Sequence, residues 1–246
     1  MKVAVISDIH GNYQALESVL EDIEKEKCEK ILCLGDLAMA GPQPDVVVSY
    51  IMDYTFDKWE IIQGNTDKMI GTCTTEMYDA LSKKFPVMAN ALIDDRDILT
   101  PEQRYYLRTL PPRKELFLGG VSILMVHGSP RRQNEDILPN MKLSKVQEMC
   151  EGEISDLILC GHTHIPCGYQ LLTKQTVVNV GSVGRPMTGV PKANYAVFDF
   201  NDGAFTVEHK AVDYDYETAA MLMQNRGFEG CETIANQLIH PTVRHF

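Results

Sequence analysis

The sequence has 246 residues and a formal net charge of −11 at pH 7, with 44% hydrophobic and 23% charged residues. These proportions are ordinary for a soluble globular protein. No apolar run reaches the ~18 residues that a membrane span requires. The acidic balance disfavours binding along the backbone of a nucleic acid, so neither a membrane nor an extended nucleic acid is an expected partner.

The cysteines and the N-terminus both favour a cytoplasmic protein. Seven cysteines occur singly, without a Cys-x-x-Cys pair, which fits neither a disulfide scaffold nor a zinc ribbon. The chain begins with the apolar run of a predicted strand, and this run does not have the pattern of a signal peptide.

The first part of the chain alternates short apolar runs with segments of helical periodicity. Residues 3–6, 31–34 and 59–62 are typical of buried strands. Apolar residues recur at helical spacing over residues 15–23, with Asn12 as the predicted N-cap, and a second helix is predicted over 45–51. This order predicts a parallel sheet with right-handed crossovers.

Residues 69–110 are predicted to be mostly helical, and the last of these helices starts at the capping sequence Thr100-Pro101-Glu102-Gln103. Short strands are then expected at residues 115–118, 121–126, 157–160, 169–172, 177–180, 195–200 and 204–209. Helical periodicity returns from residue 214. We expect one domain over 1–212, with a helical insertion at 69–110, and a helical extension over 213–246 that packs on the same domain.

Five short polar clusters follow the apolar runs and together offer ligands for two metal ions. The predicted ligands are Asp8, His10, Asp36, Asn65, His127, His162 and His164. Carboxylate oxygen, amide oxygen and neutral imidazole are the groups that hold hard or borderline divalent metals. In a centre with two ions ~3.5–4 Å apart, one carboxylate bridges them. Asp36, which follows Gly35, is the candidate for that role.

In this order, the motifs resemble the calcineurin-like metallophosphoesterase superfamily, and in particular its small bacterial and archaeal phosphodiesterase branch. The resemblance covers roughly residues 1–210. It implies an α/β fold, a four-layer α/β/β/α sandwich with two mixed β-sheets. It also implies two divalent cations, with manganese as the first expectation and iron, zinc or nickel as alternatives.

The resemblance divides the ligands between the two ions. Asp8, His10, Asp36 and His164 would bind one, and Asp36, Asn65, His127 and His162 would bind the other. Asp36, Asn65 and His127 are thereby expected to be catalytic. The implied reaction is the hydrolysis of a small phosphoester by in-line attack of a metal-bridging hydroxide.

Residues 179–186 resemble a glycine-rich loop on the substrate side of the site in this branch. The predicted substrate-binding residues are Asn12, Asp67, Gly181, Ser182 and Arg185. Arg185 would reach a phosphate, whereas Asp67 has an alternative role as the anchor of its own turn. Arg131 and Arg132 could grip a phosphate or form a solvated basic pair.

One departure from the superfamily concerns the leaving group. Many members have a histidine after the motif asparagine, and that histidine is thought to protonate the leaving alkoxide. Here Thr66 follows Asn65, and the segment after Asp36 lacks the Asp-Arg-Gly continuation of protein phosphatases. We therefore expect activated phosphodiesters to be hydrolysed faster than alkyl monoesters.

Two other functions remain open at this stage. A nucleotide pyrophosphohydrolase similar to the diadenosine tetraphosphatases would use the same ligands. A non-catalytic protein-binding scaffold, like the retromer subunit of this fold, would be expected to show degenerate ligands, and the sequence shows none. The C-terminal helices could cover the core or pair with a second subunit, so a homo-oligomer is also open.

The remaining histidines and one acidic run receive structural interpretations. His209, His240 and His245 are interpreted as structural residues, and Asp94, Asp95 and Asp97 as part of a solvated loop.

Overall fold

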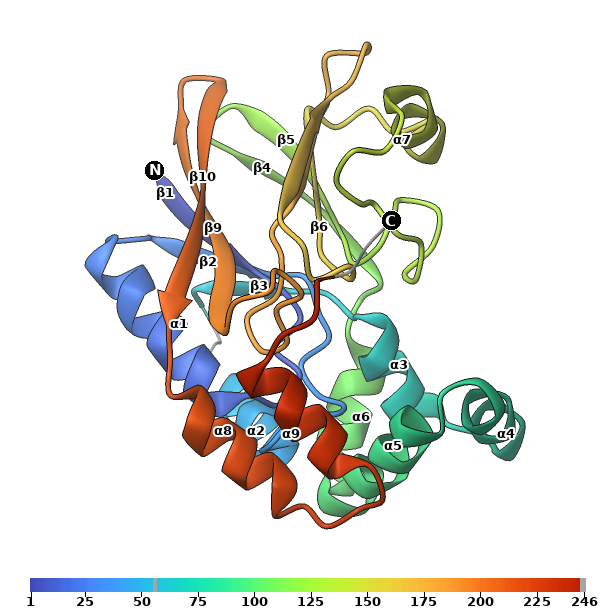
Figure 1. Ribbon diagram of the computed structural model, residues 1–246. Helices are drawn as coiled ribbons and strands as arrows, with labels where there is room; N and C mark the ends of the chain where they lie inside the picture. Colours follow the sequence, from blue (N-terminus) through green and yellow to red (C-terminus); the bar gives the residue numbers. More distant parts are fainter. Residues whose placement is uncertain (55–56, 244–246) are drawn as a thin grey trace.

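Two five-stranded sheets stack against each other in the computed structural model, which describes residues 1–54 and 57–243 (Figure 1). The first sheet has the order β10 (Ala204–Asp213), β9 (Lys192–Asn201), β1 (Lys2–Ile6), β2 (Lys30–Cys33) and β3 (Trp59–Ile61). The second sheet has the order β4 (Arg113–Leu118), β5 (Val121–Val126), β6 (Leu157–Cys160), β8 (Thr176–Asn179) and β7 (Cys167–Gln170).

Both sheets are mixed. In the first, β1, β2 and β3 are parallel, joined by the crossover helices α1 (Tyr13–Lys25) and α2 (Pro44–Tyr54), and β9 and β10 are antiparallel. In the second, β5, β6 and β8 are parallel, whereas β4 and β7 are antiparallel edge strands. The predicted four-layer sandwich with two mixed sheets is confirmed.

Three hydrophobic cores separate the four layers. The central core joins the facing sides of the sheets, with Val3 and Leu32 from the first and Ile123 and Leu159 from the second. A larger core lies between the first sheet and its helices. A smaller one lies between the second sheet and α7 (Leu143–Met149). Helix α7 was not predicted, because it has only seven residues and two buried positions, too few to show a helical period.

The predicted helical segment forms α3 (Asn65–Thr72), α4 (Thr75–Lys84), α5 (Pro86–Ile98) and α6 (Pro101–Thr109). The capping sequence at Thr100 is confirmed, since its Oγ accepts from the Gln103 N–H at 3.2 Å. Helix α3 begins four residues before the predicted segment. Gly64 is its N-cap, and the Asp67 carboxylate accepts the Gly64 N–H at 2.9 Å. Asn65 therefore stands at the first position of a helix.

The C-terminal helices α8 (Tyr216–Gln224) and α9 (Cys231–Ile239) bury Ala219, Met223 and Leu238 in the larger core. Arg226, between them, pairs with Asp95 at 2.7 Å and with Asp94. The prediction of a solvated acidic loop at Asp94 and Asp95 is wrong, because these residues lie in α5 and Asp95 is fully buried. The local run of acidic residues suggested exposure, because the partner that neutralises Asp95, Arg226, lies 131 residues away in the sequence.

The three remaining histidines are far from equivalent. His209, on β10, contacts the Asn179 carbonyl through Nε2 at 2.8 Å, which agrees with a structural role. His240 is exposed at the end of α9, and His245 lies outside the described residues. No helix within the described ranges combines the length and apolarity that a bilayer crossing demands.

Candidate metal centre

The predicted ligands gather where strands of both sheets end, on unusual backbone. Asp8 follows β1, Asp36 follows β2, and His162 and His164 follow β6. All four residues, and His10, have positive φ values between 48° and 67°. Non-glycine residues seldom adopt this left-handed conformation, and it persists only where the surrounding structure enforces it. The chain here holds polar side chains in place at the expense of backbone strain.

A first group consists of Asp8, His10 and His164, whose potential ligand atoms all lie within 4.8 Å of one another. Asp8 Oδ1 lies 3.2 Å from His164 Nε2 and 3.8 Å from His10 Nε2. The two imidazole Nε2 atoms are 3.2 Å apart. All three residues are buried, so a cation here would be surrounded by protein on several sides.

A second group consists of Asp8, Asp36 and His127, again within 4.8 Å. Asp36 Oδ2 lies 3.3 Å from His127 Nε2 and 3.8 Å from His10 Nε2. Asp36 therefore stands between an imidazole of each group, as a bridging carboxylate would. Asp8 also lies between them, since its Oδ1 is 3.8 Å from His127 Nε2.

The orientation of three imidazoles leaves their Nε2 atoms free for a cation. In each ring Nδ1–H donates to a backbone carbonyl at 2.6–2.9 Å, that of Met39 for His10, Leu34 for His127 and Arg185 for His164. A neutral ring fixed in this way carries its lone pair on Nε2, and such bonds are typical of metal-binding histidines.

Unpaired buried atoms provide an independent test of whether metal ions fit. Asp8 Oδ1, Asn65 Oδ1 and His127 Nε2 are buried and have no hydrogen-bond partner among the described residues. A buried polar atom without a partner costs about 1–3 kcal/mol. These orphaned atoms come from the predicted ligands, and oxygen and imidazole nitrogen are a suitable donor set for manganese, iron, zinc or nickel.

The electrostatics of the cluster favour added positive charge. Burial alone would raise the pKa of both carboxyls, but the imidazoles keep that of Asp36 at about 2 and that of Asp8 well below its usual range. Burial and His164 lower the pKa of His10 to about 3. Burial also opposes charge on His127, yet Asp36 and Asp8 raise its pKa to about 10. The two buried carboxylates thus depend on neighbouring positive charge to stay ionised, and a bound cation would supply such charge.

His162 lies at the margin of this cluster. The His162 backbone N–H donates to Asp8 Oδ2 at 2.9 Å, and its ring packs edge-on to His127 with the centroids 5.3 Å apart. Its Nε2, however, is 3.4 Å from Asp136 Oδ1, so the imidazole belongs to neither group. No sequence pattern pointed to Asp136, which follows a loop without periodicity.

Asp67 was predicted to bind substrate or, alternatively, to anchor its own turn. Its side chain is fully buried, and its carboxylate accepts the N–H groups of Asp36, Leu37 and Gly64 at 2.8–2.9 Å. The alternative interpretation, that Asp67 anchors a turn, agrees with these contacts. The turn concerned carries Asp36, so Asp67 orients a predicted ligand.

Asn12, Gly181 and Ser182 are likewise buried, and their contacts are with protein. Asn12 Oδ1 caps α1 by accepting the Ala15 N–H at 3.1 Å, as its predicted capping role requires. Ser182 Oγ donates to the Asp8 carbonyl at 2.8 Å. The predicted substrate contacts of Asn12, Gly181 and Ser182 stay a prediction, since the contacts seen here are within the protein. The 179–186 loop supports the backbone of Asp8.

Arg185 remains available for an anionic ligand. Its nearest polar contacts are Met88 Sδ at 3.9 Å and Gln237 Oε1 at 3.4 Å, and no carboxylate pairs with it among the described residues. Burial lowers the pKa of Arg185, whereas Asp36 and Asp8 raise it. The guanidinium therefore interacts electrostatically with both carboxylates of the cluster.

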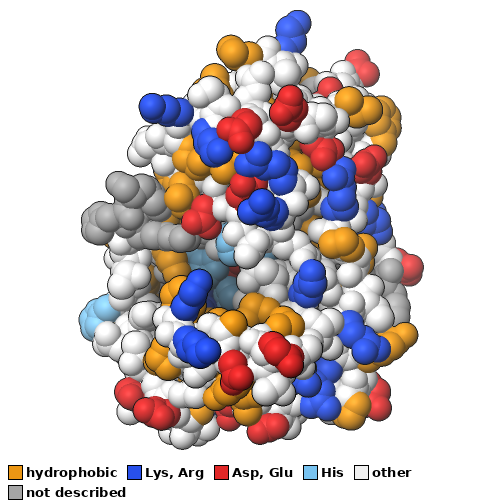
Figure 2. Space-filling view, turned by 90° about the vertical axis from the view of Figure 1, so that its right-hand side faces the viewer, with side chains coloured by type: hydrophobic (Ala, Val, Ile, Leu, Met, Phe, Trp, Pro, Cys, Tyr) orange, Lys and Arg blue, Asp and Glu red, His pale blue; other side chains and the backbone are white. Residues whose placement is uncertain are grey.

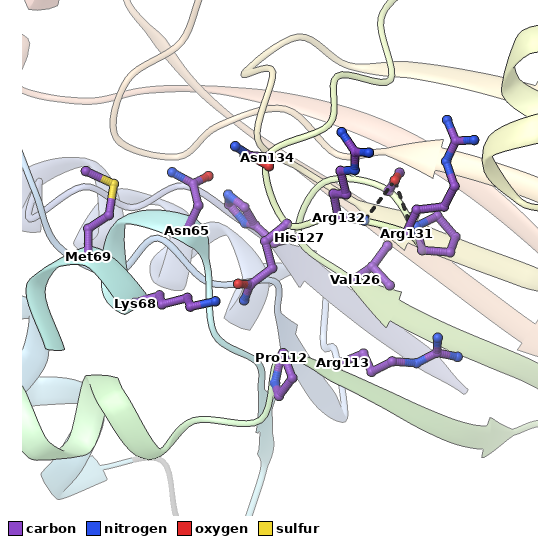
Figure 3. A pocket seen from close by; sticks show the side chains of 13 residues that line it. Asn65, Lys68, Met69, Pro112, Arg113, Val126, His127, Arg131, Arg132 and Asn134 are labelled. Atoms are coloured by element: carbon purple, nitrogen blue, oxygen red, sulfur yellow. Dashed lines mark hydrogen bonds between the residues drawn. The ribbon is translucent and has the colours of Figure 1, made fainter. Parts of the chain in front are cut away.

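A pocket of about 500 Å³ opens beside the cluster (Figure 3). His127 and Asn65 form part of its wall, and Lys68, Arg113 and Arg132 also line it. In the space-filling view, histidine side chains lie at the bottom of a hollow whose rim includes basic, acidic and hydrophobic side chains (Figure 2). A ligand therefore has access to the cluster from this side.

The family model of the calcineurin-like phosphoesterase superfamily domain matches residues 1–203. The chain belongs to this superfamily. It is 32% identical over 241 residues to the uncharacterized protein MJ0912 of Methanocaldococcus jannaschii, covering 91% of this chain and 93% of that protein. It is 24% identical over 199 residues to the phosphodiesterase YfcE of Escherichia coli, covering 81% and 88%.

A solved structure agrees with this membership. A metallophosphoesterase from Sphaerobacter thermophilus superimposes with a TM-score of 0.75 at 26% identity, over 97% of this chain and 98% of that one. The superfamily assignment makes the chain a phosphoesterase, a hydrolase of phosphoric esters. The match over residues 1–203 spans all five polar clusters singled out in the sequence.

Proposed function

We propose that this phosphoesterase hydrolyses a small phosphodiester with two divalent cations bound where strands of both sheets end. The observation that carries the proposal is the convergence of three imidazole Nε2 atoms on the carboxylates of Asp8 and Asp36. Each of those rings is oriented by a backbone carbonyl.

Asp8, His10, Asp36 and His164 would hold one cation. Asp36, Asn65, His127 and His162 would hold the other, for which His162 must turn from Asp136. When bound, the cations would neutralise phosphoryl oxygens and lower the pKa of a water molecule at the site. Manganese is our first candidate, because carboxylate and amide oxygens suit it; the imidazoles suit iron, zinc or nickel as alternatives.

The surrounding chain fixes the carboxylate of Asp36, the residue that would be shared by the two cations, before substrate arrives. The Thr66 N–H donates to Asp36 Oδ1 at 2.9 Å, which leaves Oδ2 facing His127 and His10. Asp67 holds the backbone N–H of Asp36 itself. A carboxylate held at both ends needs little rearrangement to bind a cation.

Arg185 would bind the oxygens of the phosphoryl group that do not leave. Its guanidinium is free of carboxylate partners among the described residues, and its charge reaches the site. Arginine suits this role because its planar fork can donate two hydrogen bonds to one phosphate.

The choice of a diester with a good leaving group follows from Thr66. Its hydroxyl donates to the Ala38 carbonyl at 3.0 Å and is almost fully buried. It is therefore poorly placed to protonate a leaving alkoxide, and esters of acidic alcohols or phenols need no such proton. The name of YfcE, a phosphodiesterase, supports the same choice.

A comparison of two substrates tests this function. With saturating manganese, we expect kcat/KM for bis(p-nitrophenyl) phosphate to exceed that for phosphoserine at least a hundredfold. Asp36→Asn should abolish the activity, and the exposed Asp97→Asn should retain it. Equal kcat/KM on the two substrates would contradict the diesterase assignment. Absence of metal-dependent hydrolysis of any phosphoester would favour the protein-binding scaffold instead.

We also infer that the protein works in a reducing compartment, the cytoplasm. All seven cysteines have free thiols, and burial raises the pKa of Cys33, Cys150 and Cys160. Buried thiols of raised pKa behave as structural residues and not as reactive ones.

A further inference from the structure

The pocket beside the metal cluster has an unusual composition for an acidic protein. We call it the basic pocket. It is lined by Asn65, Lys68, Met69, Pro112, Arg113, Val126, His127, Ser129, Pro130, Arg131, Arg132, Gln133 and Asn134. Four of these residues are lysine or arginine and none is acidic, whereas the whole chain has 34 acidic and 23 basic residues. The pocket is therefore a local concentration of positive charge.

Two of the four cations are already neutralised by carboxylates outside the pocket lining. Arg113 donates to both carboxylate oxygens of Glu153 at 2.9 Å. Arg131 contacts Glu135 at 2.7 Å and Glu148 at 3.1 Å. These pairs hold the walls of the pocket and leave little net charge for a ligand.

The other two, Lys68 and Arg132, have no ion-pair partner within the described part of the chain. Lys68 lies one turn after Asn65 on α3, and its side chain extends toward the space beside His127 (Figure 3). The Arg132 backbone is fixed, since its carbonyl accepts the Ser129 N–H at 2.9 Å and its N–H donates to Ser129 Oγ at 3.2 Å. Arg132 thus presents its side chain from an ordered turn.

We propose that the basic pocket binds a second anionic group of the substrate, a phosphate or a carboxylate, through Lys68 and Arg132. The proposal rests on the proposed function, because it places the ester phosphate at the neighbouring metal centre. A volume of about 500 Å³ is within the range of small-ligand sites and accommodates a charged arm. The substrate is then a phosphoester that carries at least one further negative charge.

A series of p-nitrophenyl phosphodiesters that differ only in the second ester arm tests the charge preference. The arms are ethyl, 2-aminoethyl, 2-carboxyethyl and 2-phosphoethyl, so the leaving group stays constant. We expect kcat/KM for at least one anionic arm to exceed that for ethyl tenfold or more, and aminoethyl to fall below ethyl. The two anionic arms distinguish carboxylate from phosphate. Equal values for all arms, or a preference for aminoethyl, would overturn the proposal.

A double variant and a matched control locate the preference in the pocket. Lys68→Gln with Arg132→Gln should lower the ratio of anionic to ethyl kcat/KM at least fivefold. Lys83→Gln with Lys84→Gln removes the same charge from the exposed end of α4 and should leave that ratio unchanged. An equal decrease of the anionic-to-ethyl ratio in both double variants would mean that only the net charge of the protein matters. That result would refute the assignment to this pocket.

A binding measurement separates this proposal from the proposed function, because it requires no turnover. Calorimetric titration of the full chain with methylenediphosphonate, which has no hydrolysable bridge, should give at least fivefold weaker binding for the Lys68→Gln, Arg132→Gln protein. If that difference persists while no ester is hydrolysed, the proposed function fails and the pocket assignment stands. Equal affinities of the two proteins would refute the pocket assignment even if diesters are hydrolysed.

Discussion

His10 and His164 face each other through their Nε2 atoms, which lie 3.2 Å apart. Both rings donate Nδ1–H to a backbone carbonyl, so in the neutral tautomers two lone pairs would point at one another. A shared proton would relieve that repulsion, but burial and His164 lower the pKa of His10 to about 3. A cation that accepts both lone pairs would resolve the conflict, and Asp8 Oδ1, 3.2 Å from His164 Nε2, could be a further ligand of it.

Metal content should differ between two ligand variants. Asp36 Oδ2 lies near the imidazoles of both groups, whereas His10 Nε2 belongs to the first group. We expect Asp36→Asn to lose both cations and His10→Gln to lose mainly one, measured by elemental analysis of the purified proteins. Asp97→Asn serves as the unaffected control. Equal metal loss in both ligand variants would contradict the proposed division.

Asp67→Asn should destabilise the protein, because the contacts of the Asp67 carboxylate are with backbone N–H groups. Its two oxygens accept three backbone N–H groups, and an amide would turn an N–H₂ donor toward some of them. Leaving buried donors unpaired costs about 1–3 kcal/mol, and we expect a loss in that range by urea unfolding. The exposed Asp97→Asn should change the unfolding free energy by less than about 0.5 kcal/mol. A fully stable Asp67→Asn protein would show that the turn does not depend on this carboxylate.

Gly35→Ala should be far more costly than Gly152→Ala, although both glycines have φ near +90°. The left-handed backbone alone costs an alanine about 1–2 kcal/mol. At Gly35 a Cβ would also lie 2.2 Å from the Gly64 backbone nitrogen, whereas at Gly152 it would meet nothing within 4 Å. By chemical unfolding, we expect Gly35→Ala to lose roughly 3 kcal/mol or more of unfolding free energy and Gly152→Ala to lose about 1 kcal/mol. Similar losses at both positions would mean that the β2 and β3 ends can separate.

The stability of the protein should depend on Asp95 between pH 4 and pH 6. Burial raises the pKa of Asp95 from 3.8 to about 6, although Arg226 acts to lower it. The folded state then binds a proton that the unfolded state releases, so the contribution of Asp95 is complete below pH 4 and is lost as the pH rises through 6. This difference in the pKa of Asp95 between the folded and unfolded states corresponds to at most about 3 kcal/mol in the free energy of unfolding.

Urea unfolding of the native chain and of Asp95→Asn at pH 5 and pH 7.5 measures this effect. The stability advantage of the native chain should be smaller at pH 7.5 than at pH 5, because asparagine does not titrate. An advantage that grows with pH would instead mean that Arg226 outweighs burial and keeps Asp95 ionised in the folded state.

The fold, and the meeting of several candidate metal ligands at one place, could be predicted from the sequence for related reasons. Buried strands read as apolar runs, and the polar residues that end them, such as Asp8 and Asp36, are of the few types that bind divalent cations. The carboxyl ends of parallel strands meet at one edge, so residues distant in sequence were expected at one site. The distances between Asp8, His127 and His164 confirm that meeting.

The partners of charged and polar groups were decided by the tertiary structure alone. Asp67 and Ser182 were predicted to bind substrate, yet in the fold they contact backbone groups that lie 30 and 174 residues away in the sequence. Among four cations of one pocket, Arg113 is neutralised by Glu153, 40 residues on, whereas Lys68 is left free within the described chain. Residue type and local period are properties of short segments, so the sequence alone determined the ligand types and the layers. Charge pairing depends on which segments lie within about 4 Å of one another, and only the folded chain establishes that.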